Sequence, residues 1–209
     1  VSVGSLAPGT GGILEGIAGS LLVDGGTDSD TLTVDARGCL LASAGTLTAN
    51  QLMGLGMPLG ILYQALETLD LALGSGDDVF IVESTQTLVT RIHTNAGDDI
   101  VSILAGTGVR VFGGAGADYL RGGPGADFLH GGEDNDLIFG NGGNDILIGG
   151  LGDDYLEGAS ANDLLAGDEV LLDHLELRVL VVSGYGRDIL VAVPDRIAFM
   201  AAVAMILTW

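Results

Sequence analysis

An aspartate recurs at every ninth residue along one stretch of the chain, and glycines precede each of them. The six positions are Asp118, Asp127, Asp136, Asp145, Asp154 and Asp163. Carboxylates beside glycine turns, together with backbone carbonyls, are oxygen donors of the kind that a hard cation such as Ca²⁺ takes, about six to eight at a time. The chemistry that this pattern predicts is therefore repeated cation binding.

The stretch from Gly113 to Ala166 divides into six nonapeptides without a slip: GGAGADYLR, GGPGADFLH, GGEDNDLIF, GNGGNDILI, GGLGDDYLE and GASANDLLA. The first six residues of each predict a turn, in which glycine allows a positive φ and a close approach to an ion. The last three predict a short strand whose middle apolar residue points into a core. Two nonapeptides then make one coil of a solenoid, with a strand on each side.

These nonapeptides resemble the calcium-binding repeat of RTX (hemolysin-type) proteins. The fit is strongest at GGAGADYLR, GGPGADFLH and GGLGDDYLE, and it weakens at GASANDLLA, where Ala159 and Ala161 replace glycines. The resemblance implies several bound Ca²⁺ ions, a parallel β-roll and type I secretion. It also implies that the six aspartates are metal ligands. The carbonyls expected to complete the coordination shells lie near Gly114, Gly116, Gly123, Gly125, Gly132, Gly143, Gly150 and Gly152.

The charge of the chain supports this interpretation. The formal net charge is −21, with 28 acidic residues against 7 basic ones, and residues 113–166 alone hold eight Asp, two Glu and one Arg. Stacking such turns without cations would bring carboxylates together at a high electrostatic cost, so we expect folding of this block to require metal. Magnesium is a poorer candidate because it retains its waters. Two alternatives remain: solvated turns in a metal-free β-helix, and an acid-rich halophilic surface.

The region before Gly113 repeats more loosely, with Gly-Asp turns and apolar strands in DGGTDSDTLTV, GSGDDVFIV and NAGDDIVSI. Residues 10–112 resemble the long repeats of giant secreted bacterial RTX and adhesin-like proteins. The spacings from Asp78 to Asp99 and from Asp99 to Asp118 are each close to one coil, whereas the span from Asp30 to Asp78 predicts extra strands. For Asp30, Asp78 and Asp99 we favour solvated turns, because each turn lacks a matching neighbour.

Together these patterns predict an all-β fold, a right-handed parallel β-helix or β-roll solenoid. We expect irregular parallel coils over 1–112, a calcium-binding β-roll over 113–166, and an apolar C-terminal cap or assembly segment over 167–209. The apolar run from Ile197 to Trp209 is too short to cross a bilayer, which needs about 20 residues. A solenoid leaves an apolar cross-section at its last coil, which a cap or a second subunit must cover.

The function that we expect is that of a secreted, calcium-binding structural solenoid at the cell surface or outside the cell. Such a protein would be a matrix, surface-layer or filament subunit that folds on calcium. The alternatives are an adhesin module, or the non-catalytic calcium-binding tail of a secreted enzyme or toxin. No catalytic motif is recognisable, so we expect no enzyme. We expect calcium and further copies of the chain as partners, forming a homo-oligomer or homopolymer, and no nucleic acid, because phosphate contacts need basic residues.

Overall fold

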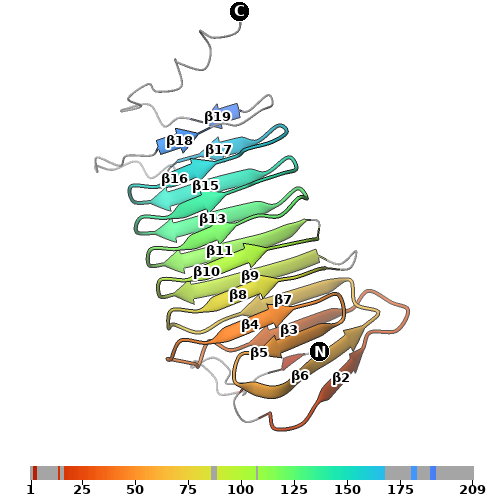
Figure 1. Ribbon diagram of the computed structural model, residues 1–209. Coiled ribbons are helices and arrows are strands. Elements are labelled where there is room, and N and C mark those ends of the chain that lie inside the picture. The colour runs from red at the N-terminus through yellow and green to blue at the C-terminus, as the bar shows by residue number, and fades with distance from the viewer. Residues whose placement is uncertain are drawn as a thin grey trace, which may run out of the picture.

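A computed structural model describes residues 2–3, 14, 17–85, 89–106, 108–167, 180–182 and 189–191. The described chain is a solenoid in which short strands stack in two sheets, from β2 and β6 at one end to β18 and β19 at the other (Figure 1). All of its regular elements are strands. The predicted all-β β-roll is therefore confirmed.

Two sheets contain all the strands. The nine-stranded sheet runs, in spatial order, β1 (Ser2–Val3), β3 (Thr31–Asp35), β7 (Thr68–Ala72), β9 (Val89–Ala96), β11 (Val109–Ala115), β13 (Phe128–Glu133), β15 (Ile146–Leu151), β17 (Leu164–Ala166) and β19 (Ile189–Val191). The ten-stranded sheet runs β18 (Leu180–Val182), β16 (Tyr155–Glu157), β14 (Leu137–Phe139), β12 (Tyr119–Arg121), β10 (Ile100–Ile103), β8 (Val79–Val82), β4 (Ala44–Leu47), β5 (Gln51–Gly54), β6 (Met57–Gln64) and β2 (Leu21–Asp24).

From β7 onward the chain passes from one sheet to the other at every strand, and each strand pairs in parallel with the strand two places later. Leu129 pairs with Leu147 and Leu147 with Leu165, so the coil repeats every 18 residues over the nonapeptides. The earlier coils are longer, 19 residues from Asp99 to Asp118 and 21 from Asp78 to Asp99. The spacings in the sequence thus predicted the coils correctly.

The core lies between the sheets and consists of one apolar residue from each strand of the repeats. The predicted inward-facing residues are Leu120, Leu129, Ile138, Leu147, Leu156 and Leu165, none of them more than 1 % exposed. Because each strand supplies one such side chain, the core is a thin column that grows coil by coil. Each coil therefore depends on its neighbours for burial.

The N-terminal part departs from a parallel solenoid. β4, β5 and β6 form an antiparallel meander, with Leu47 opposite Leu52 and Leu52 opposite Ile61, all fully buried. These strands account for the long span between Asp30 and Asp78, where the sequence predicted extra strands. They also correct the expectation that residues 1–112 form parallel coils throughout.

The sheets continue beyond Ala166. β18 pairs in parallel with β16, and β19 with β17, so part of the segment expected to be a cap continues both sheets. The apolar run 197–209 lies outside the described residues. Among the residues described, there is no helix with the length and hydrophobicity that crossing a membrane would require.

Candidate metal centre: two rows of aspartates

The turns bring the aspartates together in two rows, one along each edge of the solenoid. Turns from the nine-stranded to the ten-stranded sheet carry the long row, which consists of Asp78, Asp99, Asp118, Asp136 and Asp154. Turns in the other direction carry the short row, which consists of Asp127, Asp145 and Asp163. All eight side chains are buried, with at most 3 % exposed. The six aspartates predicted to bind metal are thus divided equally between two edges.

Within each row, the backbone of one coil holds the carboxylate of the next. The N–H of Asp118 donates to Asp136 Oδ1 at 2.8 Å, and the N–H of Asp136 donates to Asp154 Oδ1 at 3.0 Å. In the short row, Asp127 donates to Asp145 Oδ1 at 2.8 Å in the same way. One oxygen of each carboxylate is therefore fixed in direction by the neighbouring coil.

The second carboxylate oxygen is left open in several turns. The buried Oδ2 atoms of Asp118, Asp136 and Asp145 accept no hydrogen bond from the residues that the structure describes. A buried oxygen without a donor costs free energy unless something else, such as a cation, compensates it. The open oxygens therefore mark where a ligand is needed.

The first glycine of each repeat lies against the Oδ2 atom of the aspartate of its own turn. A Cβ at Gly131 would collide with Asp136 Oδ2 and would lie 2.6 Å from the carbonyl oxygen of Gly149, in the next coil. Equivalent crowding is found at Gly113, Gly122, Gly140, Gly149 and Gly158. The crowding atom is the carboxylate oxygen of the repeat's own Asp, the carbonyl oxygen of the next coil, or both. A carboxylate oxygen and a carbonyl oxygen thus approach the same face of the first glycine, which is possible because glycine has no side chain.

These first glycines were not among the predicted ligands, although the GG pair at the start of four repeats was the available signal. The predicted glycines come later in each repeat, and six of them have positive φ: Gly114, Gly116, Gly132, Gly143, Gly150 and Gly152. A Cβ on any of these six would collide with backbone of the preceding coil. Gly123 donates its N–H to Asp127 Oδ2 at 2.9 Å, and the carbonyl of Gly125 lies against Gly143. These glycines allow the coils to stack closely.

Burial dominates the electrostatics of the rows. It raises the pKa of Asp118 and Asp145 to about 7 and that of Asp136 to about 8, and neighbouring carboxylates raise each further. Burial also raises the pKa of Asp99 to about 7, although the nearby Thr94 hydroxyl opposes the shift. An adjacent cation would favour the charged form instead. Without a cation, these four carboxyl groups resist ionisation at neutral pH.

The donor set fits calcium. Within the described part of the chain, no three His, Cys, Asp or Glu side chains converge to hold a metal, so an ion in these turns would depend on backbone carbonyls as well. Open carboxylate oxygens beside glycine carbonyls provide such a mixed, all-oxygen environment, which Ca²⁺ prefers. A family model described as RTX calcium-binding nonapeptide repeat (4 copies) matches residues 110–138 and 139–169. Residues 110–169 are an RTX repeat array.

RTX repeats bind Ca²⁺, and an array of this length binds several ions. The comparison with curated proteins found no match for the chain. The comparison with solved structures likewise found none.

The structure corrects one argument about the turns upstream of the RTX array. Asp78 and Asp99 do have matching neighbours, because Asp78 donates its N–H to Asp99 Oδ1 at 2.6 Å and Asp99 donates to Asp118 Oδ1 at 2.9 Å. Both therefore lie in the long row. Asp30 has no aspartate opposite it in the next coil, and its N–H donates to Glu67 Oε2 at 2.6 Å.

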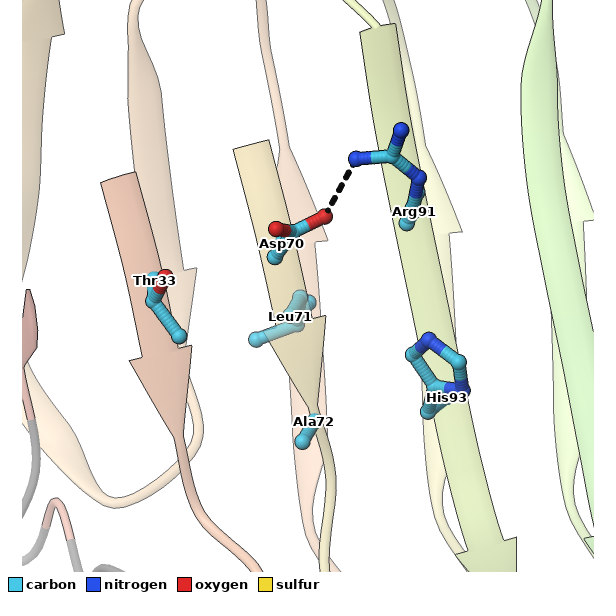
Figure 2. A pocket seen from close by; sticks show the side chains of 6 residues that line it. All are labelled: Thr33, Asp70, Leu71, Ala72, Arg91 and His93. Carbon is cyan, nitrogen blue, oxygen red and sulfur yellow. Dashed lines mark hydrogen bonds and ion pairs between the residues drawn. The ribbon is translucent and has the colours of Figure 1, made fainter. Parts of the chain in front are cut away.

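A hollow on the outer face of the nine-stranded sheet has a different character. Its lining comes from β3, β7 and β9 and consists of Thr33, Asp70, Leu71, Ala72, Arg91 and His93 (Figure 2). Asp70 is paired with Arg91 at 2.9 Å, and the ring of His93 stacks on Phe112 at 4.6 Å between centroids. Because its carboxylate is already neutralised by Arg91, the hollow does not resemble the aspartate rows.

Proposed function

We propose that this chain is a secreted structural solenoid whose RTX array folds when it binds calcium outside the cell. We further propose that it serves as a subunit of an extracellular matrix, surface layer or filament. The observation that carries the proposal is the pair of rows in which buried carboxylates stack at intervals of one coil, and in which Oδ2 of Asp118, Asp136 and Asp145 has no hydrogen-bond donor among the described residues.

Within the array, we assign the carboxylates of Asp118, Asp127, Asp136, Asp145, Asp154 and Asp163 as calcium ligands. We assign carbonyls of the glycine turns as their partners, including those of the first glycines such as Gly131 and Gly149. Support for the first glycines comes from the crowding around Gly131, where Asp136 Oδ2 and the Gly149 carbonyl approach the same space.

The proposed site of action follows from calcium concentration. Extracellular calcium modules have dissociation constants of about 0.1–1 mM, so such an array would be empty inside a cell and filled outside it. Empty, the stacked carboxylates of a chain with net charge −21 oppose the compact state. Filled, the same carboxylates hold the coils together. The array would thus be exported unfolded and would become rigid after export.

The proposal is tested by far-UV circular dichroism of the calcium-depleted chain, titrated with calcium and separately with magnesium. We expect a cooperative gain of β signal near millimolar calcium that magnesium does not reproduce. An unchanged, already folded spectrum would show that the array does not require calcium to fold.

A second candidate function, an adhesin module that binds a glycan, is favoured by one observation. Tyr119, Phe139 and Tyr155 lie on the outer face of the ten-stranded sheet, with neighbouring ring centroids 5.5 Å apart. Aromatic residues make up only 5 % of the chain, yet these three lie together and are partly exposed. Binding of the calcium-loaded chain to a glycan array, lost on replacing Phe139 with Ala, would support this function.

Assembly into homopolymers is part of the proposal. A solenoid can stack end to end through heterologous contacts, which generate open filaments when the rotation does not close. We assign the apolar run 197–209, which lies outside the described residues, as the segment that packs on a neighbouring subunit. Sedimentation of the calcium-loaded chain should show polymers, and deletion of 197–209 should leave monomers. Unchanged polymers after the deletion would exclude this role for the run.

A further inference from the structure

The turn at Asp99 differs from every RTX turn at one position. In each RTX repeat the residue five places before the Asp is the first glycine, such as Gly113 before Asp118. The residue five places before Asp99 is Thr94. Asn95 pairs with Gly114, so Thr94 lies directly opposite Gly113 in the stack. The long row therefore continues to Asp99. The turn at Asp99, however, has a threonine in place of the first glycine.

Thr94 places a side chain where each RTX turn has a glycine. Its side chain is completely buried, and its hydroxyl donates to the carbonyl oxygen of Gly113 at 2.6 Å. In the next turn the equivalent carbonyl is that of Gly131, which borders the free space beside Asp118 Oδ2. The Thr94 hydroxyl thus engages, in the turn of Asp99, the carbonyl whose counterpart in the turn of Asp118, that of Gly131, we assign to an ion.

We propose that Thr94 excludes calcium from the turn at Asp99 and so sets the point where the ion row of this edge begins. This inference rests on the proposed function, because it assumes that the RTX aspartates bind the ions. The hydroxyl, by donating to the Gly113 carbonyl, links the two coils as an ion links later ones. The coils before Gly113 therefore stack without metal on this edge.

The turn at Asp78 agrees with this assignment. The residue five places before it is Leu73, which is fully buried. Both oxygens of Asp78 accept backbone hydrogen bonds, Oδ1 from Ser43 at 2.6 Å and Oδ2 from Gly74 at 3.1 Å. Backbone N–H groups thus hold both oxygens of the first member of the long row.

The test is the number of calcium ions bound per chain, measured by equilibrium dialysis on the full-length protein. Thr94→Gly should bind one ion more than the wild type, and Thr94→Gly combined with Asp99→Asn should lose that ion again. Thr94→Ser retains the hydroxyl and should leave the number unchanged. Thr90→Gly is a matched control, because Thr90 is equally buried on the same strand but lies four residues before Thr94.

Two single variants keep the test decisive if Thr94→Gly does not fold. Asp99→Asn should leave the number of ions unchanged, whereas Asp118→Asn should reduce it. Loss of an ion in Asp99→Asn, or no gain in a folded Thr94→Gly, would overturn the role of Thr94. Failure of the proposed function gives a different result, in which Asp118→Asn and the other RTX variants lose no ion.

Discussion

The backbone N–H of Asp118 donates to Oδ1 of Asp136, 18 residues later, at 2.8 Å, while Oδ2 of Asp136 lies beside Gly131 in its own turn. The two oxygens of one carboxylate therefore have separate roles. The first ties two coils together through the backbone, and the second faces the proposed ion. Replacement by asparagine keeps an acceptor for the first role and removes the charge needed for the second.

Asp136→Asn should therefore have effects of opposite sign with and without calcium. With calcium, we expect the midpoint of the calcium titration to rise about tenfold, which corresponds to about 1.4 kcal/mol. In a chelator, we expect a stronger β signal than that of the wild type. The reason is that a neutral amide replaces a buried carboxyl group whose Oδ2 atom has no hydrogen-bond donor. Circular dichroism measures both. Asp28→Asn is the control, because Asp28 is exposed and away from both rows. If Asp136→Asn changed folding in the same direction with calcium and with chelator, the prediction would be contradicted.

Gly131→Ala should lower calcium affinity and stability together. The added methyl group would collide with Asp136 Oδ2, the oxygen assigned to the ion. We expect a loss of about 1–3 kcal/mol in the free energy of unfolding with calcium, the usual cost of overpacking. Gly142→Ala is the matched control in a neighbouring turn, where the nearest atom to an added Cβ would be 3.4 Å away. Equal thermal unfolding midpoints for the two variants would exclude this role for Gly131.

Much of this fold could be predicted from the sequence because the period of nine carries it. The spacing from Leu129 to Leu147 specifies both the coil and the core, since residues one coil apart must lie above one another. The aspartates could be predicted as a set for the same reason. Their division into two rows follows once two nonapeptides form one coil.

Other features depend on contacts between coils of unequal length, which a fixed period does not reveal. Asp99 and Asp118 are 19 residues apart, yet they occupy equivalent positions because the turns absorb the extra residue. The role of Thr94 could be seen only when the register placed it opposite Gly113. The antiparallel pairing of β4 with β5 was also hidden, because alternation of apolar residues does not distinguish parallel from antiparallel strands.

In the absence of calcium, the pH dependence of folding should be the reverse of ordinary acid denaturation. The folded-state pKa values of Asp118, Asp136 and Asp145 are raised from 3.8 to between about 7 and about 8. The folded array therefore binds more protons than the unfolded chain between these limits. The stability is fully present below about pH 4 and is lost as the pH rises through about 7 to 8.

A calcium-depleted sample should accordingly gain β signal on acidification from pH 8 to pH 5, as measured by circular dichroism in a chelator-free, metal-free buffer. Calcium affinity should change in the opposite direction, rising with pH over the same window, because protons and calcium compete for the same oxygens. A β signal that falls on acidification of the depleted chain would contradict the prediction.

Calcium removal should unfold only part of the solenoid. The coils before Gly113 have a core of their own, in which Leu32, Leu69 and Phe80 are fully buried, and at the boundary the Thr94 hydroxyl links the coils without metal. In a chelator we therefore expect slow hydrogen exchange for the amides of residues 21–82 and fast exchange for those of residues 113–167. Mass spectrometry of peptides from the two regions measures both at once. Restored calcium should slow exchange in the second region alone, since its carboxylates then hold the coils together. Loss of protection across both regions on chelation would show that the N-terminal coils also depend on the ions.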